Sequence, residues 1–466
     1  MSEHVSPLDA TFLELEQTDP SAHMHIGGVL VFDAPSPSPH DLVEHLESRL
    51  GALPRYRQRL SSTHTGGLTW PSWEEELDFD IERHVHRAAL PSPGGEAELM
   101  EWVADYWSHR LDRRHPLWDV VILEGLAGGR WALCTKTHHC MVDGVGSMDV
   151  GDILLDTQPD TTAPPKRPRA LPQRHDSMLS AAVKTVRGAA DAAMHPRAAL
   201  ARSRALASLI LHDEVVPAPR SSVNGQIGEA RRFAVVRVRL SELKAIKRAL
   251  GGTVNDVALA AISGGLRELL ERRGDELHAP GLRAMVPVNL RQAGERLALG
   301  NRITSLFVHL PVHEADPAAR YAAAVDEAET LKSGSQAAGG ATLISLTGLA
   351  PPVIHSLLAQ SLYASRLFNL TVTNVPGPQL PLYVGGSQLR EIFGLVPLAA
   401  HHSIGVAILS YDGGVTFGIV ADRDSVPDID VLAAGIESSI DELRKLAARA
   451  RRRTHRRAPA KASRSR

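Results

Sequence analysis

The sequence contains very little cysteine. Cys134 and Cys140 are the two cysteines among its 466 residues. Such a pair does not amount to the disulfide framework that stabilises many small secreted domains. The cysteine content therefore favours a reducing compartment, and we expect a cytoplasmic protein.

Long apolar runs are also missing. No stretch reaches the roughly 18 uninterrupted apolar residues of a membrane-spanning helix. The first residues, MSEHVSPLDATFLELEQ, are acidic and lack the apolar run of a signal peptide. Apolar residues nevertheless make up 43% of the chain, which is ample for large cores. We therefore expect a globular protein of two or three domains whose membrane contacts are peripheral.

Positive and negative charges nearly balance, at −2 overall, but their distribution is uneven. Residues 444–466 contain eleven Lys and Arg residues and no acid, which leaves 40 basic and 53 acidic residues, or −13, in residues 1–443. Residues 449–466 are too charged and too poor in apolar side chains to fold alone, so we predict a disordered tail. Such a tail either holds the protein near anionic lipid or simply keeps it soluble. Specific nucleic-acid binding is not expected.

The most informative stretch is 131–148, WALCTKTHHCMVDGVGSM. Its first residues alternate as in a strand and lead to His138 and His139. Successive side chains of a strand point to opposite faces, so one imidazole should face a reaction cavity while the other braces the scaffold. A neutral imidazole is well suited to accept a proton near pH 7. Asp143 is close enough to turn back toward His139 or to pair with a cation, and Gly144 permits a tight exit from the strand.

The rest of the chain alternates strand and helix patterns on both sides of a proline-rich segment. Before this segment we expect strands at 24–32 and 119–123 and helices at 10–15, 40–50 and 96–109. After it, we expect strands at 233–240, 282–290, 303–310, 370–374, 405–411 and 415–420, and helices at 241–250, 257–270, 319–333, 343–366 and 430–447. The sequence thus predicts an α/β (α+β) protein with one unit at 1–156, a crossover at 157–228, a second unit at 229–448 and the tail at 449–466.

Four polar residues of the second half are candidate site residues. Asn255 and Asp256 stand at the start of a long apolar helix, where each is either a helix cap or part of a site. Asn374 ends a strand before the rigid turn VPGP, where its amide either contacts a ligand or stabilises the turn. Arg291 follows another strand and is a candidate cation for Asp143.

Several motifs resemble those of one enzyme family. The pattern HHxxxDG, formed by His138, His139, Asp143 and Gly144, is similar to the signature of coenzyme-A-dependent acyltransferases, which include chloramphenicol acetyltransferase and peptide-synthetase condensation domains. The order PLW, HHxxxDG, proline-rich crossing, GGTVND, PVNLR, GN, TNVPGP and a final DGG hairpin spans almost the whole chain. It resembles the bacterial wax ester synthase/diacylglycerol acyltransferases. Thr373 stands where we expect a serine, which is a conservative departure.

The resemblance implies two chloramphenicol-acetyltransferase-like subdomains with mixed sheets flanked by helices, and an active-site channel between them. It also implies transfer of a long-chain acyl group from acyl-CoA to diacylglycerol. A wax ester synthase that acylates long-chain fatty alcohols is the nearest alternative, and a non-catalytic acyl-CoA- or lipid-binding relative is a further one. The expected location is the inner face of the membrane or the surface of lipid bodies.

The resemblance also suggests roles for the candidate residues. His139 would be the general base, His138 would orient it, and Asp143 would hold the loop and the tautomer. Asn255 is a candidate oxyanion donor, and the remaining candidate substrate contacts are Gly144, Asn374 and Asp256. No metal or other cofactor is expected, because the thioester is already activated. Cys140 as an acyl-enzyme nucleophile is a rival that strand geometry disfavours, because neighbouring side chains point apart.

Overall fold

The computed structural model describes residues 3–61, 71–141, 151, 153–159, 217–289, 303–333 and 367–457. Asp143, Gly144 and Arg291 lie outside these ranges, and so does the helix expected at 343–366.

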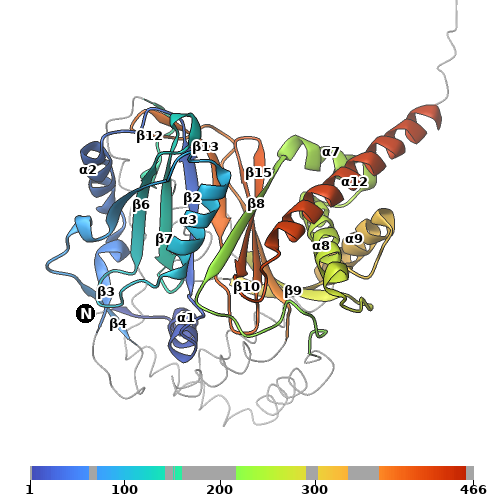
Figure 1. Ribbon diagram of the computed structural model, residues 1–466, viewed down its shortest axis with the longest axis horizontal. Coiled ribbons are helices and arrows are strands. Elements are labelled where there is room, and N and C mark those ends of the chain that lie inside the picture. The colour runs from blue at the N-terminus through green and yellow to red at the C-terminus, as the bar shows by residue number, and fades with distance from the viewer. Residues whose placement is uncertain are drawn as a thin grey trace, which may run out of the picture.

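Two six-stranded mixed sheets lie side by side, and helices flank both (Figure 1). The first sheet has the order β12-β13-β2-β7-β6-β5, and only β5 and β6 are parallel in it. Its strands are β2 (His25–Phe32), β5 (Val85–Ala89), β6 (Trp118–Glu124), β7 (Trp131–His138), β12 (Tyr383–Val384) and β13 (Ser387–Leu395). A small sheet of β1 (Glu3–His4), β4 (Ser72–Glu75) and β3 (Gln58–Leu60) lies beside it.

Both faces of the first sheet are covered. On one face Trp131 and Leu133 of β7 share a core with Leu42 of helix α2 (Pro39–Leu50). On the other face Ala132 and Cys134 share a core with α3 (Glu96–Ser108). Because side chains alternate along a strand, Lys136 and His138 also belong to the face that α3 covers.

The N-terminal helix α1 (Pro7–Thr18) is longer than the sequence pattern indicated. Its N-cap is Ser6, whose Oγ accepts a hydrogen bond from the Asp9 amide at 3.1 Å, so the helix expected at 10–15 begins earlier, at Pro7. Pro7 explains the earlier start, because proline lacks an amide proton and is favoured in the first turn of a helix.

The second sheet has the order β10-β9-β11-β14-β15-β8 and is covered by four of the described helices. Its strands are β8 (Arg231–Arg239), β9 (Leu282–Asn289), β10 (Ile303–Leu310), β11 (Leu370–Pro376), β14 (Ile404–Tyr411) and β15 (Gly414–Asp422). The helices are α7 (Leu240–Leu250), α8 (Val254–Arg273), α9 (Pro317–Ser333) and α12 (Ile429–Arg457). The two longest pack closely, because a Cβ on Gly265 of α8 would lie 2.8 Å from the carbonyl oxygen of Leu432 in α12.

Strands β12 and β13 come from the second half of the chain but complete the first sheet. β13 pairs antiparallel with β2, with Leu395 opposite Gly27. It also packs against the second sheet, where a Cβ on Gly418 would lie 2.1 Å from the carbonyl oxygen of Gly394. The expected assignment of all of residues 229–448 to the second unit therefore does not hold for these two strands.

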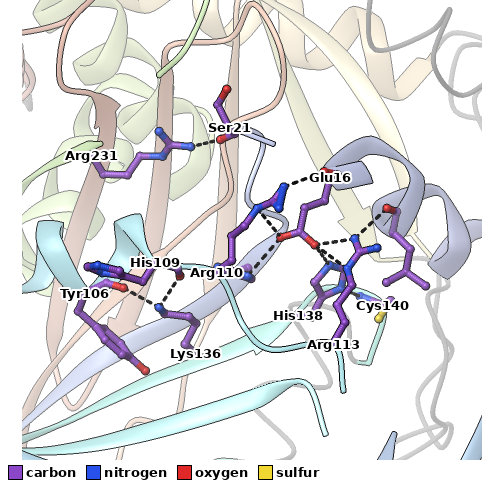
Figure 2. Close-up of polar contacts among 12 residues, drawn as sticks. Glu16, Ser21, Tyr106, His109, Arg110, Arg113, Lys136, His138, Cys140 and Arg231 are labelled. Carbon is purple, nitrogen blue, oxygen red and sulfur yellow. Dashed lines mark hydrogen bonds and ion pairs between the residues drawn. The ribbon is translucent and has the colours of Figure 1, made fainter. Parts of the chain in front are cut away.

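In addition to β13, a buried arginine connects the two halves of the molecule. Arg231, at the start of β8, donates a hydrogen bond to the carbonyl of Ser21, which lies between α1 and β2 (Figure 2). It also donates to the carbonyl of Gly228 at 2.6 Å. Its guanidinium also lies 3.8 Å from Asp422, and burial lowers its pKa to about 10. The connection that follows α1 is thus anchored to the second sheet.

Helix α12 continues through Arg457 and projects away from the body of the molecule (Figure 1). The prediction that the tail is disordered from residue 449 is therefore wrong for residues 449–457. Alanine and arginine are good helix formers, and extending an existing helix avoids the cost of nucleation. Among the described residues no helix is both long and apolar enough to cross a membrane.

Candidate active site

The two adjacent histidines lie where β7 becomes a turn. His138 is the last residue of the strand, and the Met141 amide donates to its carbonyl at 2.9 Å, which closes the turn. The His139 amide still donates to the carbonyl of Met24 at 2.8 Å. The backbone thus stays attached to the first sheet up to His139 and then bends away.

His138 is fully buried, and its two ring nitrogens have different partners. Nδ1 accepts a hydrogen bond from the amide of Cys140 at 3.2 Å, so it carries no proton. Nε2 lies 3.2 Å from the Glu16 carboxylate and donates to it (Figure 2). Burial lowers the pKa of His138, which keeps the ring neutral, and the two contacts together select one tautomer. This arrangement is suited to a bracing role.

Glu16, on α1, is the carboxylate that holds His138. Its Oε2 also accepts hydrogen bonds from Nη2 and Nε of Arg113, at 2.7 and 3.2 Å. Burial alone would raise the pKa of Glu16, but His138, His25 and Arg113 hold it well below its usual range. Sequence reasoning missed this residue, because nothing in the N-terminal pattern indicates that it meets a histidine 122 positions later.

His139 is partly exposed, and the ring of Phe12 covers one of its faces. The two ring centroids are 4.0 Å apart and the planes differ by 14°. Burial, together with a smaller contribution from neighbouring His138, lowers the pKa of His139 to about 4. The imidazole is therefore neutral near pH 7, which is the form that accepts a proton.

Both cysteines are buried. Burial raises the pKa of Cys140 well above its usual value, and it also raises the pKa of Cys134. Because the thiolate rather than the thiol is the nucleophile, neither side chain suits covalent catalysis. The geometry gives no support to the acyl-enzyme alternative.

Lys136 is a buried cation on the same face of β7 as His138. Its Nζ donates to the carbonyls of Tyr106 and His109, at 2.5 and 2.8 Å, and lies 3.9 Å from the ring centroid of Tyr106 (Figure 2). These carbonyls lie at the C-terminal end of α3, where a positive charge is favourable. Burial lowers its pKa to about 8. Lys136 thus fastens α3 to the strand that carries His138.

The candidates on α8 and β11 form a separate group. Thr253 is the N-cap of α8, and the Asp256 carboxylate accepts from its amide at 2.7 Å in a capping box. Asn255 Oδ1 accepts a hydrogen bond from Nδ2 of Asn374 at 2.9 Å, and this pair is exposed. Among the described residues, no hydrogen bond joins the Asn255–Asn374 pair to His138 or His139. No cluster of His, Cys, Asp and Glu in the described residues is arranged to hold a metal ion.

Comparisons with known proteins give the family. Residues 5–258 match the model of the wax ester synthase/diacylglycerol acyltransferase catalytic domain, and residues 299–444 match that of the WS/DGAT C-terminal domain. The chain belongs to the WS/DGAT family. The predicted resemblance is thereby confirmed, and the chain is an acyltransferase of this family.

Sequence relatives align with almost the whole of this WS/DGAT chain. "Probable diacyglycerol O-acyltransferase tgs1" of Mycobacterium tuberculosis (strain ATCC 25618 / H37Rv) is 35% identical, over 94% of this chain and 95% of its own. "Probable diacyglycerol O-acyltransferase tgs2" of the same strain is 33% identical, over 94% and 98%.

Solved structures agree with the fold. The wax ester synthase/diacylglycerol acyltransferase from Marinobacter aquaeolei VT8 is 28% identical with a TM-score of 0.69, and the match covers 96% of this chain and 100% of that one. The first condensation domain of the calcium-dependent antibiotic synthetase is 18% identical with a TM-score of 0.64, covering 96% and 97%. The predicted α/β class with two mixed sheets, shared by WS/DGAT enzymes and condensation domains, is confirmed.

Proposed function

We propose that this chain transfers a long-chain acyl group from acyl-CoA to the hydroxyl of diacylglycerol, with His139 as the general base. The observation that supports this role is the contrast between the adjacent histidines. His138 is buried and both of its ring nitrogens are engaged, whereas His139 is partly exposed and neutral. This contrast supports His139, rather than His138, as the imidazole that meets the substrate.

The reaction needs one proton acceptor and no change in oxidation state. His139 takes the proton of the attacking hydroxyl while the hydroxyl oxygen bonds to the thioester carbonyl carbon. The carbon–sulfur bond then breaks, and the imidazolium returns the proton to the coenzyme A sulfur. A low pKa makes that imidazolium a strong acid, which favours this second transfer. A well-placed base of this kind contributes about 10²–10⁴-fold.

The names of the relatives support the proposed acceptor. Proteins named as probable diacylglycerol acyltransferases are 35% and 33% identical to this chain along nearly its whole length. The Marinobacter protein, which is named for both activities, is 28% identical. Diacylglycerol is therefore the proposed acceptor, and a long-chain fatty alcohol is the second candidate.

The remaining candidate residues keep secondary roles in this proposal. Asp143 would hold the loop that follows His139, with Arg291 as its cation, and Gly144 would let that loop approach the substrate. Asn255 would contribute an amide donor to the oxyanion, and its hydrogen bond to Asn374 would fix the orientation of that amide. Asp256 is engaged in the α8 capping box, which favours a scaffold role for it.

The substrates are lipids, so the enzyme would work at a lipid surface from the cytoplasmic side. We propose peripheral attachment to the membrane or to lipid bodies, supported by the basic end of α12. Arg449, Arg451 and Arg452 are exposed there. Basic residues close to an anionic surface contribute up to about 1 kcal/mol each.

Release of free coenzyme A from a long-chain acyl-CoA tests the function. Diacylglycerol and hexadecanol are offered side by side, and we expect faster release with diacylglycerol. His139→Ala should lower the rate at least about 100-fold. His278→Ala, at an exposed histidine of the second half, should leave it unchanged. A protein that binds acyl-CoA but releases no coenzyme A with either acceptor would be a non-catalytic relative.

A further inference from the structure

We propose that Glu16 is a positioning residue, which fixes the tautomer of His138 and through it the turn that presents His139. The assignment rests on the proposed function of His139. Glu16 contacts His138 (Figure 2), so its effect on the reaction passes through this buried histidine.

Helix α1 contacts both histidines with residues one turn apart. Phe12 stacks on His139, and Glu16 accepts from His138. Residues four apart lie on the same side of a helix, so a single face of α1 serves the adjacent histidines. Any shift of α1 would therefore change the surroundings of both rings at once.

The tautomer of His138 is the link between Glu16 and the turn. While Nε2–H donates to Glu16, Nδ1 keeps the lone pair that accepts the Cys140 amide. Without an acceptor at Glu16, the ring can carry its proton on Nδ1 instead. That N–H would then face the Cys140 N–H, and two donors cannot form a hydrogen bond. The turn after His138 would lose the hydrogen bond from the Cys140 amide.

The surroundings of Glu16 allow it to be replaced. Its two arginine neighbours, Arg113 and Arg110, are 36% and 43% exposed, so both guanidiniums can reach water when the carboxylate is removed. A cation left buried without its partner would be far more harmful. We therefore expect variants at this position to fold.

Two substitutions separate the acceptor from the charge. In Glu16→Gln the amide oxygen can occupy the Oε2 position and still accept the Nε2 proton of His138. In Glu16→Met the side chain has a similar volume, but no oxygen remains to accept the Nε2 proton of His138. We expect kcat to fall about 100-fold in Glu16→Met, as misplaced catalytic groups commonly cause, with KM for acyl-CoA nearly unchanged. Glu16→Gln should lose less than about tenfold, because a neutral acceptor is weaker but keeps the tautomer.

A second carboxylate–histidine pair provides the matched control. Glu327 accepts from Nδ1 of His309 at 2.8 Å in the second half of the molecule. Glu327→Gln changes the same kind of contact outside the site, so its kcat should equal that of the wild type.

Hydrogen exchange measured by mass spectrometry tests the same assignment without any assay of activity. In the peptide that contains residues 138–141, the Cys140 amide should exchange faster in Glu16→Met but not in Glu16→Gln or Glu327→Gln. Equal kcat losses in Glu16→Gln and Glu16→Met, or unchanged exchange in Glu16→Met, would overturn the assignment. If the wild type shows no acyl transfer but the exchange pattern holds, the proposed function fails while the tautomer assignment stands.

Discussion

The ring of Phe12 lies nearly parallel to that of His139, with centroids 4.0 Å apart and an angle of 14° between the planes. This contact with α1 restricts rotation of the imidazole ring out of its observed plane. A base is effective only when its lone pair points at the proton that it removes, so the orientation of this ring matters as much as its pKa.

Replacing Phe12 by leucine should lower kcat by about two- to tenfold, because a stacked aromatic pair contributes about 0.5–1.5 kcal/mol beyond its area. KM for acyl-CoA should change little. The control is Phe79→Leu, which removes a similar stack on His84, with centroids 5.5 Å apart. Steady-state kinetics of both variants provide the comparison. An equal loss in both would show that the contact with His139 has no special role.

The pH profile of the reaction should lack a step at pH 6.5. His139 stays neutral until the pH approaches its folded pKa of about 4, so protonation should remove activity only as the pH falls toward that value. The measurement is kcat between about pH 5 and 8 at saturating acyl-CoA, with the ester product quantified directly. A half-maximal rate near pH 6.5 would contradict the lowered pKa.

The stability of the fold should decline in mild acid. Burial lowers the pKa of several histidines, namely His23, His25, His84, His138, His139 and His402. Below about pH 6.5 the unfolded chain binds protons that the folded chain excludes. The free energy of unfolding therefore decreases as the pH is lowered, by up to about 1.4 kcal/mol per pH unit for each such histidine. The contribution is fully present above the unfolded pKa.

Thermal unfolding between about pH 7.5 and 5 checks this expectation. His402→Gln should flatten the dependence, because the pKa of His402 is lowered to about 4 in the folded state. His278→Gln should not, since that histidine is 76% exposed. A melting temperature that is constant over this range would contradict the conclusion that these buried histidines are neutral in the folded protein.

Deletion of residues 449–466 should weaken binding to vesicles that contain phosphatidylglycerol, and added salt should weaken wild-type binding in the same way. Vesicles of phosphatidylcholine alone provide the reference, and flotation measures the bound fraction. Coenzyme A release with soluble substrates should be unaffected by the deletion. If the truncated chain binds anionic vesicles as well as the full chain, the basic end has no part in attachment.

The sequence was sufficient for the family, because HHxxxDG and the other motifs are local patterns, and it also drew attention to the adjacent histidines at the end of β7. It could not indicate Glu16, whose partner lies far away in the chain. The position of β13 could not be predicted either, because it pairs with β2, a strand from a distant part of the sequence. Composition misjudged residues 449–457, because a charged segment that cannot start a helix can still prolong one.

Strand β13 has a consequence for how the protein is made. During synthesis, the residues that carry the histidine pair emerge long before 387–395, the segment that covers the free edge of β2. Until then that edge presents unpaired amides and carbonyls, a surface on which other chains can add strands. A fragment ending near residue 258, where the match to the catalytic domain stops, would keep this edge permanently bare and is expected to aggregate.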